Sequence, residues 1–160
     1  MSADFGGSGI TRELYDWILA NIPQGSCILE LGSGSVSTQH LSKHYRMVSV
    51  EDNAGFVGKF ESHYIHAPNI GGWYDVSVLR RELSKVDPYR LLLVDGPSGS
   101  ISRMGLMGNL SLFNLDAVII IDDTWRPVEK QMAAMLSQML GRPAVDYVQF
   151  TVIPARISSV

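Results

Sequence analysis

The chain has 160 residues, enough for one domain with a buried core but too few for two. Hydrophobic residues make up 46% of the sequence and charged residues 18%, which indicates a globular protein and excludes a disordered or membrane-spanning chain. The formal net charge of -3 gives no general basic field, so we expect neither nucleic acid nor a membrane surface as a partner. The nearest candidate for a local basic patch, formed by Arg80, Arg81 and Lys85, is expected to be a solvated helix face.

Cysteine content and the N-terminal sequence bear on where the protein works. Cys27 is the only cysteine, so no disulfide can form within the chain, and its apolar neighbours favour a core position. Residues 1–9 are glycine-rich, lack the basic start and apolar core of a signal peptide, and are expected to be flexible. The sequence therefore predicts one soluble cytoplasmic domain over residues 1–160.

Helix and strand patterns alternate along the first part of the chain. Apolar residues at helical spacing come first, and short apolar runs bounded by turn residues follow. We expect a helix over 10–22, a strand over 26–31, a helix over 37–45, a strand over 47–50 and a helix over 54–62. Two successive strand–helix units of this kind are typical of a parallel sheet.

The alternation continues through the second part. We expect a strand over 64–67, a loop over 68–72, a helix over 76–86, a strand over 90–94, a short helical stretch, and the strongest strand over 117–121. A helix then begins at Pro127 and ends before Gly141. The tail over 145–157 forms one or two strands, with little room for a turn between them.

This order of elements defines the fold class. It predicts an α/β protein, a Rossmann-like three-layer αβα sandwich with a mostly parallel sheet of roughly six to seven strands. Ligands of such sheets bind outside the carboxyl ends of the strands. The polar motifs of this chain fall at those ends, which favours a binding site there.

A glycine-containing turn and an acidic residue mark the first candidate site. The first strand runs into Gly32-Ser33-Gly34, where the absence of Cβ atoms lets a ligand lie against the main chain. The second strand ends in Glu51, at the distance along the chain where a carboxylate accepts the ribose hydroxyls of a bound nucleoside. Together the two features predict a nucleoside-containing ligand.

The charge of the turn narrows the ligand further. Glu30 stands two residues before Gly32, and Ser37 takes the place of the third glycine of the dinucleotide pattern. A carboxylate there would repel a pyrophosphate but would suit a ligand that carries an ammonium and a sulfonium group. This favours S-adenosylmethionine over NAD.

Over about residues 26 to 140, the chain resembles the class I S-adenosylmethionine-dependent methyltransferases, and more closely a group of small, poorly characterised bacterial members. Residues 28–34 (Ile-Leu-Glu-Leu-Gly-Ser-Gly) resemble the first motif of that family, and residues 48–51 (Val-Ser-Val-Glu) resemble the second. The loop over 71–73 and the Leu-Val-Asp-Gly sequence over 93–96 add to the likeness.

The resemblance implies roles for individual residues. It assigns to the turn that receives the methionine part of the cofactor Glu30, Gly32, Ser33 and Gly34. It implies that Glu51 holds the ribose, and that Asp52 and Asn53 border the adenine. Val36 and Ser37 depart from the glycine and small residues that the family commonly has further along its first motif.

Three aspartates at the ends of the later strands are candidates for the chemistry. Asp95 ends the fourth strand, where the family usually has a polar residue facing the substrate, and we also expect it to border the cofactor. Asp122 and Asp123 end the fifth strand. If the three converge, their oxygens would suit Mg²⁺ or Mn²⁺. The alternative, which we favour, is that no metal binds and that Asp122 or Asp123 caps the next helix.

These observations predict methyl transfer from S-adenosylmethionine to a small-molecule acceptor, with an oxygen nucleophile as one option and with Asp95 and Asp122 as catalytic residues. Two alternatives stay open. An NAD-dependent oxidoreductase would share the glycine turn and Glu51, and a non-catalytic S-adenosylmethionine-binding module would fit the short chain.

Overall fold

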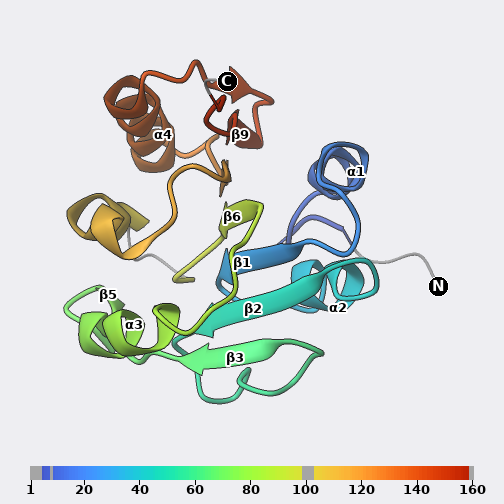
Figure 1. Ribbon diagram of the computed structural model, residues 1–160, viewed down its shortest axis with the longest axis vertical. Coiled ribbons are helices and arrows are strands. Elements are labelled where there is room, and N and C mark those ends of the chain that lie inside the picture. Colours follow the sequence, from blue (N-terminus) through green and yellow to red (C-terminus); the bar gives the residue numbers. More distant parts are fainter. Residues whose placement is uncertain (1–4, 8, 99–102, 159–160) are drawn as a thin grey trace.

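A seven-stranded sheet with the order β3-β2-β1-β6-β7-β9-β8 forms the centre of the molecule (Figure 1). Its strands are β1 (Cys27–Leu31), β2 (Arg46–Glu51), β3 (His63–His66), β6 (Leu91–Val94), β7 (Val118–Asp122), β8 (Val145–Asp146) and β9 (Phe150–Ile153). The pairings among β3, β2, β1, β6 and β7 are parallel, whereas β9 pairs antiparallel with both β7 and β8. The predicted α/β class and mostly parallel sheet are confirmed.

The computed structural model describes residues 5–7, 9–98 and 103–158. Of the N-terminal segment 1–9 that we expect to be flexible, residues 1–4 and 8 lie outside this description. Within the described residues, no helix has both the length and the apolar character that crossing a membrane requires.

Helices cover both faces of the sheet. The helices α1 (Arg12–Asn21) and α2 (Ser37–Leu41) lie on one side, and α3 (Val76–Leu83), η1 (Arg103–Leu112) and α4 (Pro127–Leu140) lie on the other (Figure 1). Each side has its own cluster of buried apolar side chains, one around Ile18 and the other around Leu136. All residues of β1 and β6 are buried, because strands covered on both faces have no solvent side. The predicted three-layer sandwich is confirmed.

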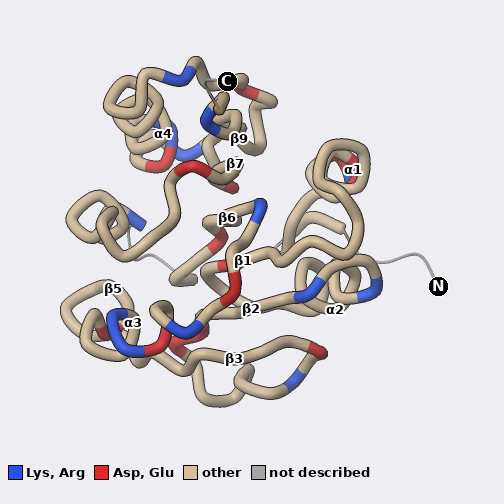
Figure 2. Tube along the Cα trace, viewed as in Figure 1, with Lys and Arg blue, Asp and Glu red and all other residues tan. Residues whose placement is uncertain are grey.

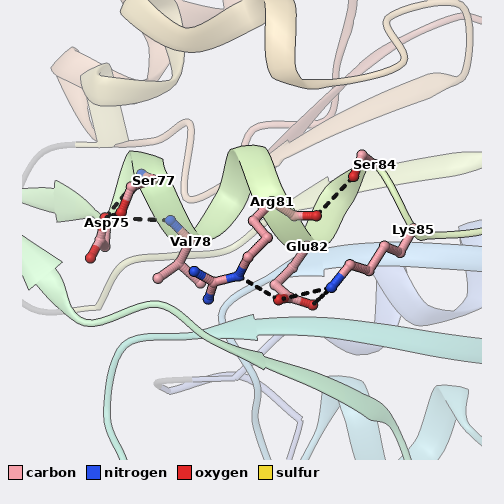
Figure 3. A network of polar contacts seen from close by, with 7 residues as sticks. All are labelled: Asp75, Ser77, Val78, Arg81, Glu82, Ser84 and Lys85. Carbon is pink, nitrogen blue, oxygen red and sulfur yellow. Dashed lines mark hydrogen bonds and ion pairs between the residues drawn. The ribbon is translucent and has the colours of Figure 1, made fainter.

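Asp75 caps α3 and explains where that helix begins. The side chain of Asp75 accepts hydrogen bonds from the main-chain N–H and the hydroxyl of Ser77, as Figure 3 shows. These bonds satisfy donors that the first turn of a helix leaves without partners. The helix follows the predicted start at Val76 but ends at Leu83, three residues before the predicted end.

The basic residues at the end of α3 and in the turn after it are exposed. Arg80, Arg81 and Lys85 are exposed, and the last two pair with Glu82 at 2.8 and 3.4 Å (Figure 3). Figure 2 shows basic residues spread over several elements of the chain. The prediction of a solvated helix face is in keeping with both observations.

The helix predicted over residues 54–62 is wrong. The segment after β2 forms successive turns instead, beginning where Asn53 accepts a hydrogen bond from the main chain of Gly55. Gly58 adopts a φ of 76°, which ends any helical run. The apolar spacing alone indicates a helix here, but Gly55 and Gly58 both disfavour helix formation.

Three further segments can be compared with the prediction: the loop over 68–72, the tail and the helix over 37–45. The predicted loop over 68–72 contains a small hairpin of β4 (Asn69–Ile70) and β5 (Trp73–Tyr74). The tail forms two strands, β8 and β9, and the tight turn between them is possible because Val148 takes a positive φ of 73°. The predicted helix over 37–45 is shorter than expected, because α2 ends at Leu41 and continues only as turns.

Candidate functional site

The predicted ligand-binding residues meet at the carboxyl ends of β1, β2 and β6. From β1 the sheet adds β2 and β3 on one side, and β6 and β7 on the other. The strand order therefore reverses between β1 and β6. A hollow of about 260 Å³, here called the β1 hollow, opens at this point. Its lining includes seven of the predicted residues: Gly32, Ser33, Gly34, Glu51, Asp52, Asn53 and Asp95.

Gly32 is required by the geometry of the turn. Its φ is 95°, and a Cβ added there would lie 2.7 Å from the main-chain oxygen of Asp95. The turn after β1 therefore packs directly against the end of β6, and no other residue fits. Gly34 has no such constraint, since an added Cβ would meet only the Ser37 hydroxyl at 3.7 Å.

Glu51 is held in place by two main-chain donors. Its Oε2 accepts from the N–H of Ser33 at 2.8 Å, and its Oε1 accepts from the N–H of Asn53 at 3.0 Å. Burial raises the pKa of Glu51 above its usual value, and the two N–H bonds oppose that rise. Each oxygen keeps a second lone pair, so the carboxylate can accept two further hydrogen bonds from a ligand.

Hydroxyl groups brace the turn from behind. The Ser33 hydroxyl lies 3.0 Å from that of Thr38 and 2.8 Å from that of Tyr64, and Thr38 also accepts from the N–H of Gly34 at 3.0 Å. These contacts tie the turn to α2 and β3. Ser33 is therefore part of a fixed network and not a freely rotating side chain.

Glu30 lies beneath the turn and does not line the β1 hollow. Its side chain is fully buried and accepts hydrogen bonds from the hydroxyls of Thr38 and Ser49. Burial raises its pKa to about 7, against the opposing effect of the hydroxyl donors. In this position the Glu30 carboxyl would act on a ligand through the turn. Its role in receiving the methionine part of the cofactor stays a prediction.

Asp95, Asp122 and Asp123 converge, and we call them the carboxylate cluster. One carboxylate oxygen from each lies within 4.8 Å of the others. Figure 2 shows acidic segments close to the β6 and β7 labels. Burial and the neighbouring Asp122 charge raise the pKa of Asp95 well above its usual value, and burial together with the Asp123 charge raises that of Asp122 to about 6.

The cluster lies between two hollows. Asp95 lines the β1 hollow, whereas Asp122 and Asp123 line a second one of about 390 Å³, here called the β7 hollow. Gly9 lines both hollows, so they adjoin. Asp95 and Asp122, which belong to one cluster, thus line two adjoining hollows.

Arg103 is a part of this site that sequence reasoning missed. It begins η1, its side chain is only 4% exposed, and its Nη2 lies 2.9 Å from Oδ2 of Asp123 and 3.5 Å from Oδ1 of Asp95. Its Nη1 donates to the main-chain oxygen of Asp122 at 2.9 Å. The available signal was an arginine within a stretch of apolar residues and glycines, which buries a charge only when acidic partners are close.

Aromatic residues near the site have different placements. Phe56, which we did not predict, lines the β1 hollow. Trp125 is 57% exposed, lines the β7 hollow and donates to Oδ1 of Asp123 at 3.2 Å. Trp73 is instead buried in the core against Tyr74 and Phe113.

A further hollow, of about 580 Å³, lies away from these residues. It is formed between the end of α4 and the segment that follows β9, and it includes Arg142 and Arg156. Asp116, which precedes β7, also lines it. It therefore opens at the amino edge of the parallel strands, opposite the edge at which the ligands of such sheets bind.

Solved structures of methyltransferases share this fold. The MycE methyltransferase of the mycinamycin biosynthetic pathway, in complex with magnesium, S-adenosylhomocysteine and mycinamycin VI, matches 89% of this chain with a TM-score of 0.58 and 13% identity. The present chain spans only 45% of MycE. The C-terminal domain of precorrin-6Y C5,15-methyltransferase from Rhodobacter capsulatus matches 94% of this chain and 92% of its own, with a TM-score of 0.59 and 13% identity.

A TehB-like S-adenosylmethionine-dependent methyltransferase from Corynebacterium glutamicum is also similar, with a TM-score of 0.56 and 15% identity over 88% of this chain and 86% of its own. Neither protein-family models nor curated protein sequences give a match. At these identities the comparisons concern the fold, and in that respect the resemblance seen in the sequence motifs is confirmed: the chain has the fold of S-adenosylmethionine-dependent methyltransferases.

Proposed function

We propose that this chain transfers a methyl group from S-adenosylmethionine to a small-molecule acceptor. The observation that carries the proposal is the fixed carboxylate of Glu51 on the wall of the β1 hollow, directly beside the glycine turn. A pre-positioned acceptor of two hydrogen bonds beside an open main-chain turn suits a nucleoside that carries an amino-acid portion. The shared fold supports the same donor.

Different residues of the β1 hollow would bind different parts of the cofactor. Glu51 would accept the ribose hydroxyls, and the main chain of Gly32, Ser33 and Gly34 would receive the methionine portion. The segment after Glu51 would border the adenine, with Asp52 and Asn53 at its edge and the Phe56 ring against its face.

The acceptor would occupy the β7 hollow. S-adenosylmethionine supplies an electrophilic methyl group: the acceptor oxygen forms a bond to its carbon while the carbon–sulfur bond breaks, and that electron pair stays on sulfur. Where the acceptor is a hydroxyl, Asp122 would take its proton, because a carboxylate with a pKa of about 6 is ionised yet basic near neutral pH. Asp95, at the border of the two hollows, would orient the acceptor.

The magnesium in MycE raises the question of a metal in this chain. The carboxylate cluster has the oxygen ligands that such an ion prefers. The guanidinium of Arg103 already bonds to this cluster, however, so these residues do not fit a metal ion as they stand. The proposed reaction therefore includes no step on a metal.

A transfer assay tests the proposal. The purified chain is incubated with S-adenosylmethionine carrying an isotopically labelled methyl group and with pools of small hydroxyl-, amine- and carbon-acid acceptors, and labelled products are detected by mass spectrometry. We expect a product that depends on the chain and that Asp122→Asn forms roughly 100-fold more slowly when the acceptor is a hydroxyl. Binding of the donor without transfer to any pool would instead support the non-catalytic binding module.

A further inference from the structure

We propose that Arg103 is a built-in cation that takes the place of a divalent metal ion in the carboxylate cluster. The inference concerns the chain's own side chains. Its test measures metal binding, so its outcome and that of the methyl-transfer proposal are independent of each other.

The contacts of Arg103 show a cation enclosed by acidic groups. Nη2 lies between Asp123 Oδ2 and Asp95 Oδ1, at 2.9 and 3.5 Å, and Nη1 donates to the main-chain oxygen of Asp122. The side chain is 4% exposed. A guanidinium so removed from water persists only where acidic partners compensate for its lost hydration. Arg103 thus links the start of η1 to the ends of both β6 and β7.

Two cationic side chains and an indole N–H already surround the Asp123 carboxylate. Its Oδ2 is shared between Arg103 and Arg126, at 2.9 and 3.7 Å, and its Oδ1 accepts from the indole N–H of Trp125 at 3.2 Å. The backbone of Asp123 is in the left-handed region, with a φ of 60°, a conformation that aspartate adopts more readily than most residues. Both carboxylate oxygens are therefore already engaged with donors.

A divalent ion would also meet a like charge. An Mg²⁺ ion binds a carboxylate oxygen at about 2.1 Å, so an ion on Oδ2 of Asp123 would lie within roughly 5 Å of Nη2 of Arg103. Repulsion at this distance in a buried site is strong. The ion could enter only if the guanidinium left, and the guanidinium has no other described acidic partner within bonding distance.

Removing the guanidinium should uncover a metal site. The carboxylate cluster would keep three oxygens within 4.8 Å of one another, close to the spacing of oxygens that share one ion. With the guanidinium of Arg103 gone, Arg126, 3.7 Å from Asp123, would remain as a counter-charge to three acidic side chains, and this imbalance would attract a divalent ion. The chain should therefore bind a divalent ion when Arg103 is replaced by a neutral residue, and not before.

The experiment uses Mn²⁺ as the probe, with free ion measured by electron paramagnetic resonance. We expect no binding by the wild-type chain up to about 1 mM Mn²⁺, and binding by Arg103→Gln that is tighter by roughly tenfold or more. The double variant Arg103→Gln with Asp122→Asn should lose that gain. Arg126→Gln serves as the matched control, because Arg126 is 37% exposed and contacts the cluster only through Asp123 at 3.7 Å; it should not bind Mn²⁺.

Two results would overturn the inference: wild-type binding of Mn²⁺ that Asp122→Asn removes, or equal absence of binding in the wild type and Arg103→Gln. If Arg103→Gln does not fold in the absence of metal, the variant is heated with and without Mn²⁺ to see whether a thermal unfolding transition appears. A ligand that binds only the folded state stabilises it, so Mn²⁺ should restore the transition in this variant and leave that of Arg103→Lys unchanged. Failure of Mn²⁺ to restore it would also count against the inference.

Discussion

The main-chain N–H of Ser33 donates a hydrogen bond of 2.8 Å to Oε2 of Glu51, and this bond joins the turn after β1 to the end of β2. A second donor, the N–H of Asn53, holds the other oxygen of the same carboxylate. The chain's own main-chain donors therefore fix this part of the wall of the β1 hollow. Such a site loses little conformational freedom on binding, which favours affinity.

The buried carboxyl of Glu30 should make stability depend on pH. The pKa of Glu30 is raised from 4.5 to about 7 in the folded chain, so the folded state favours the protonated carboxyl. The contribution of this carboxyl to the free energy of unfolding is therefore complete below about pH 4.5 and is lost as the pH rises through about 7. Glu30→Gln stays neutral and should remove Glu30's share of this loss, up to about 3 kcal/mol. Urea unfolding at a series of pH values measures it.

Glu61→Gln is the matched control for that series, because Glu61 is exposed. Its pH dependence should equal that of the wild type. Part of the dependence should persist even in Glu30→Gln, since the pKa values of Asp95 and Asp122 are raised as well. A Glu30→Gln curve that follows the wild type over the whole range would show that Glu30 is not responsible.

The two glycines of the turn should respond differently to alanine. Gly32→Ala introduces a Cβ at a φ of 95° and within 2.7 Å of the main-chain oxygen of Asp95, so it should lower the free energy of unfolding by about 2 kcal/mol or more. Gly34→Ala meets only the Ser37 hydroxyl at 3.7 Å and should change it by less than about 1 kcal/mol. Denaturant unfolding compares them, and equal losses would contradict the close packing at Gly32.

Asp122 should set the acidic limb of the activity profile. A base must be ionised to accept a proton, so kcat for a hydroxyl acceptor should fall as the pH drops through about 6, the value to which the pKa of Asp122 is raised. Asp122→Asn should lower kcat by roughly 100-fold and abolish this limb. Asp116→Asn, at the exposed opposite end of β7, should leave the profile intact. An unchanged limb in Asp122→Asn would assign the proton to another group.

The sequence predicted the sheet well because the central strands are short apolar runs between clear turn residues. The run over 117–121, for example, corresponds to β7 with a shift of one residue. It also predicted which polar residues would meet, since Glu51 and Asp95 directly end or follow strands that are parallel and whose ends share one edge. Both results depend only on local pattern and on the geometry of parallel sheets.

Other features depend on contacts that local pattern does not encode. The alternation of side chains along β1 puts Glu30 on the opposite face from Leu29 and Leu31, but only the structure shows that α2 covers it there. Arg103 reaches Asp123 from twenty residues away through the start of η1, and no periodicity indicates that approach. Such long-range partners decide the electrostatics of the site.

The central claim is most directly tested by calorimetric titration of the wild-type chain with S-adenosylhomocysteine and with NAD. We expect S-adenosylhomocysteine to bind and NAD not to bind. Glu51→Gln should lower the affinity for S-adenosylhomocysteine by roughly tenfold or more, equivalent to about 1.4 kcal/mol of binding free energy. Glu61→Gln should bind S-adenosylhomocysteine as the wild type does. Binding of NAD without S-adenosylhomocysteine, or equal affinity of Glu51→Gln and the wild type, would contradict the account.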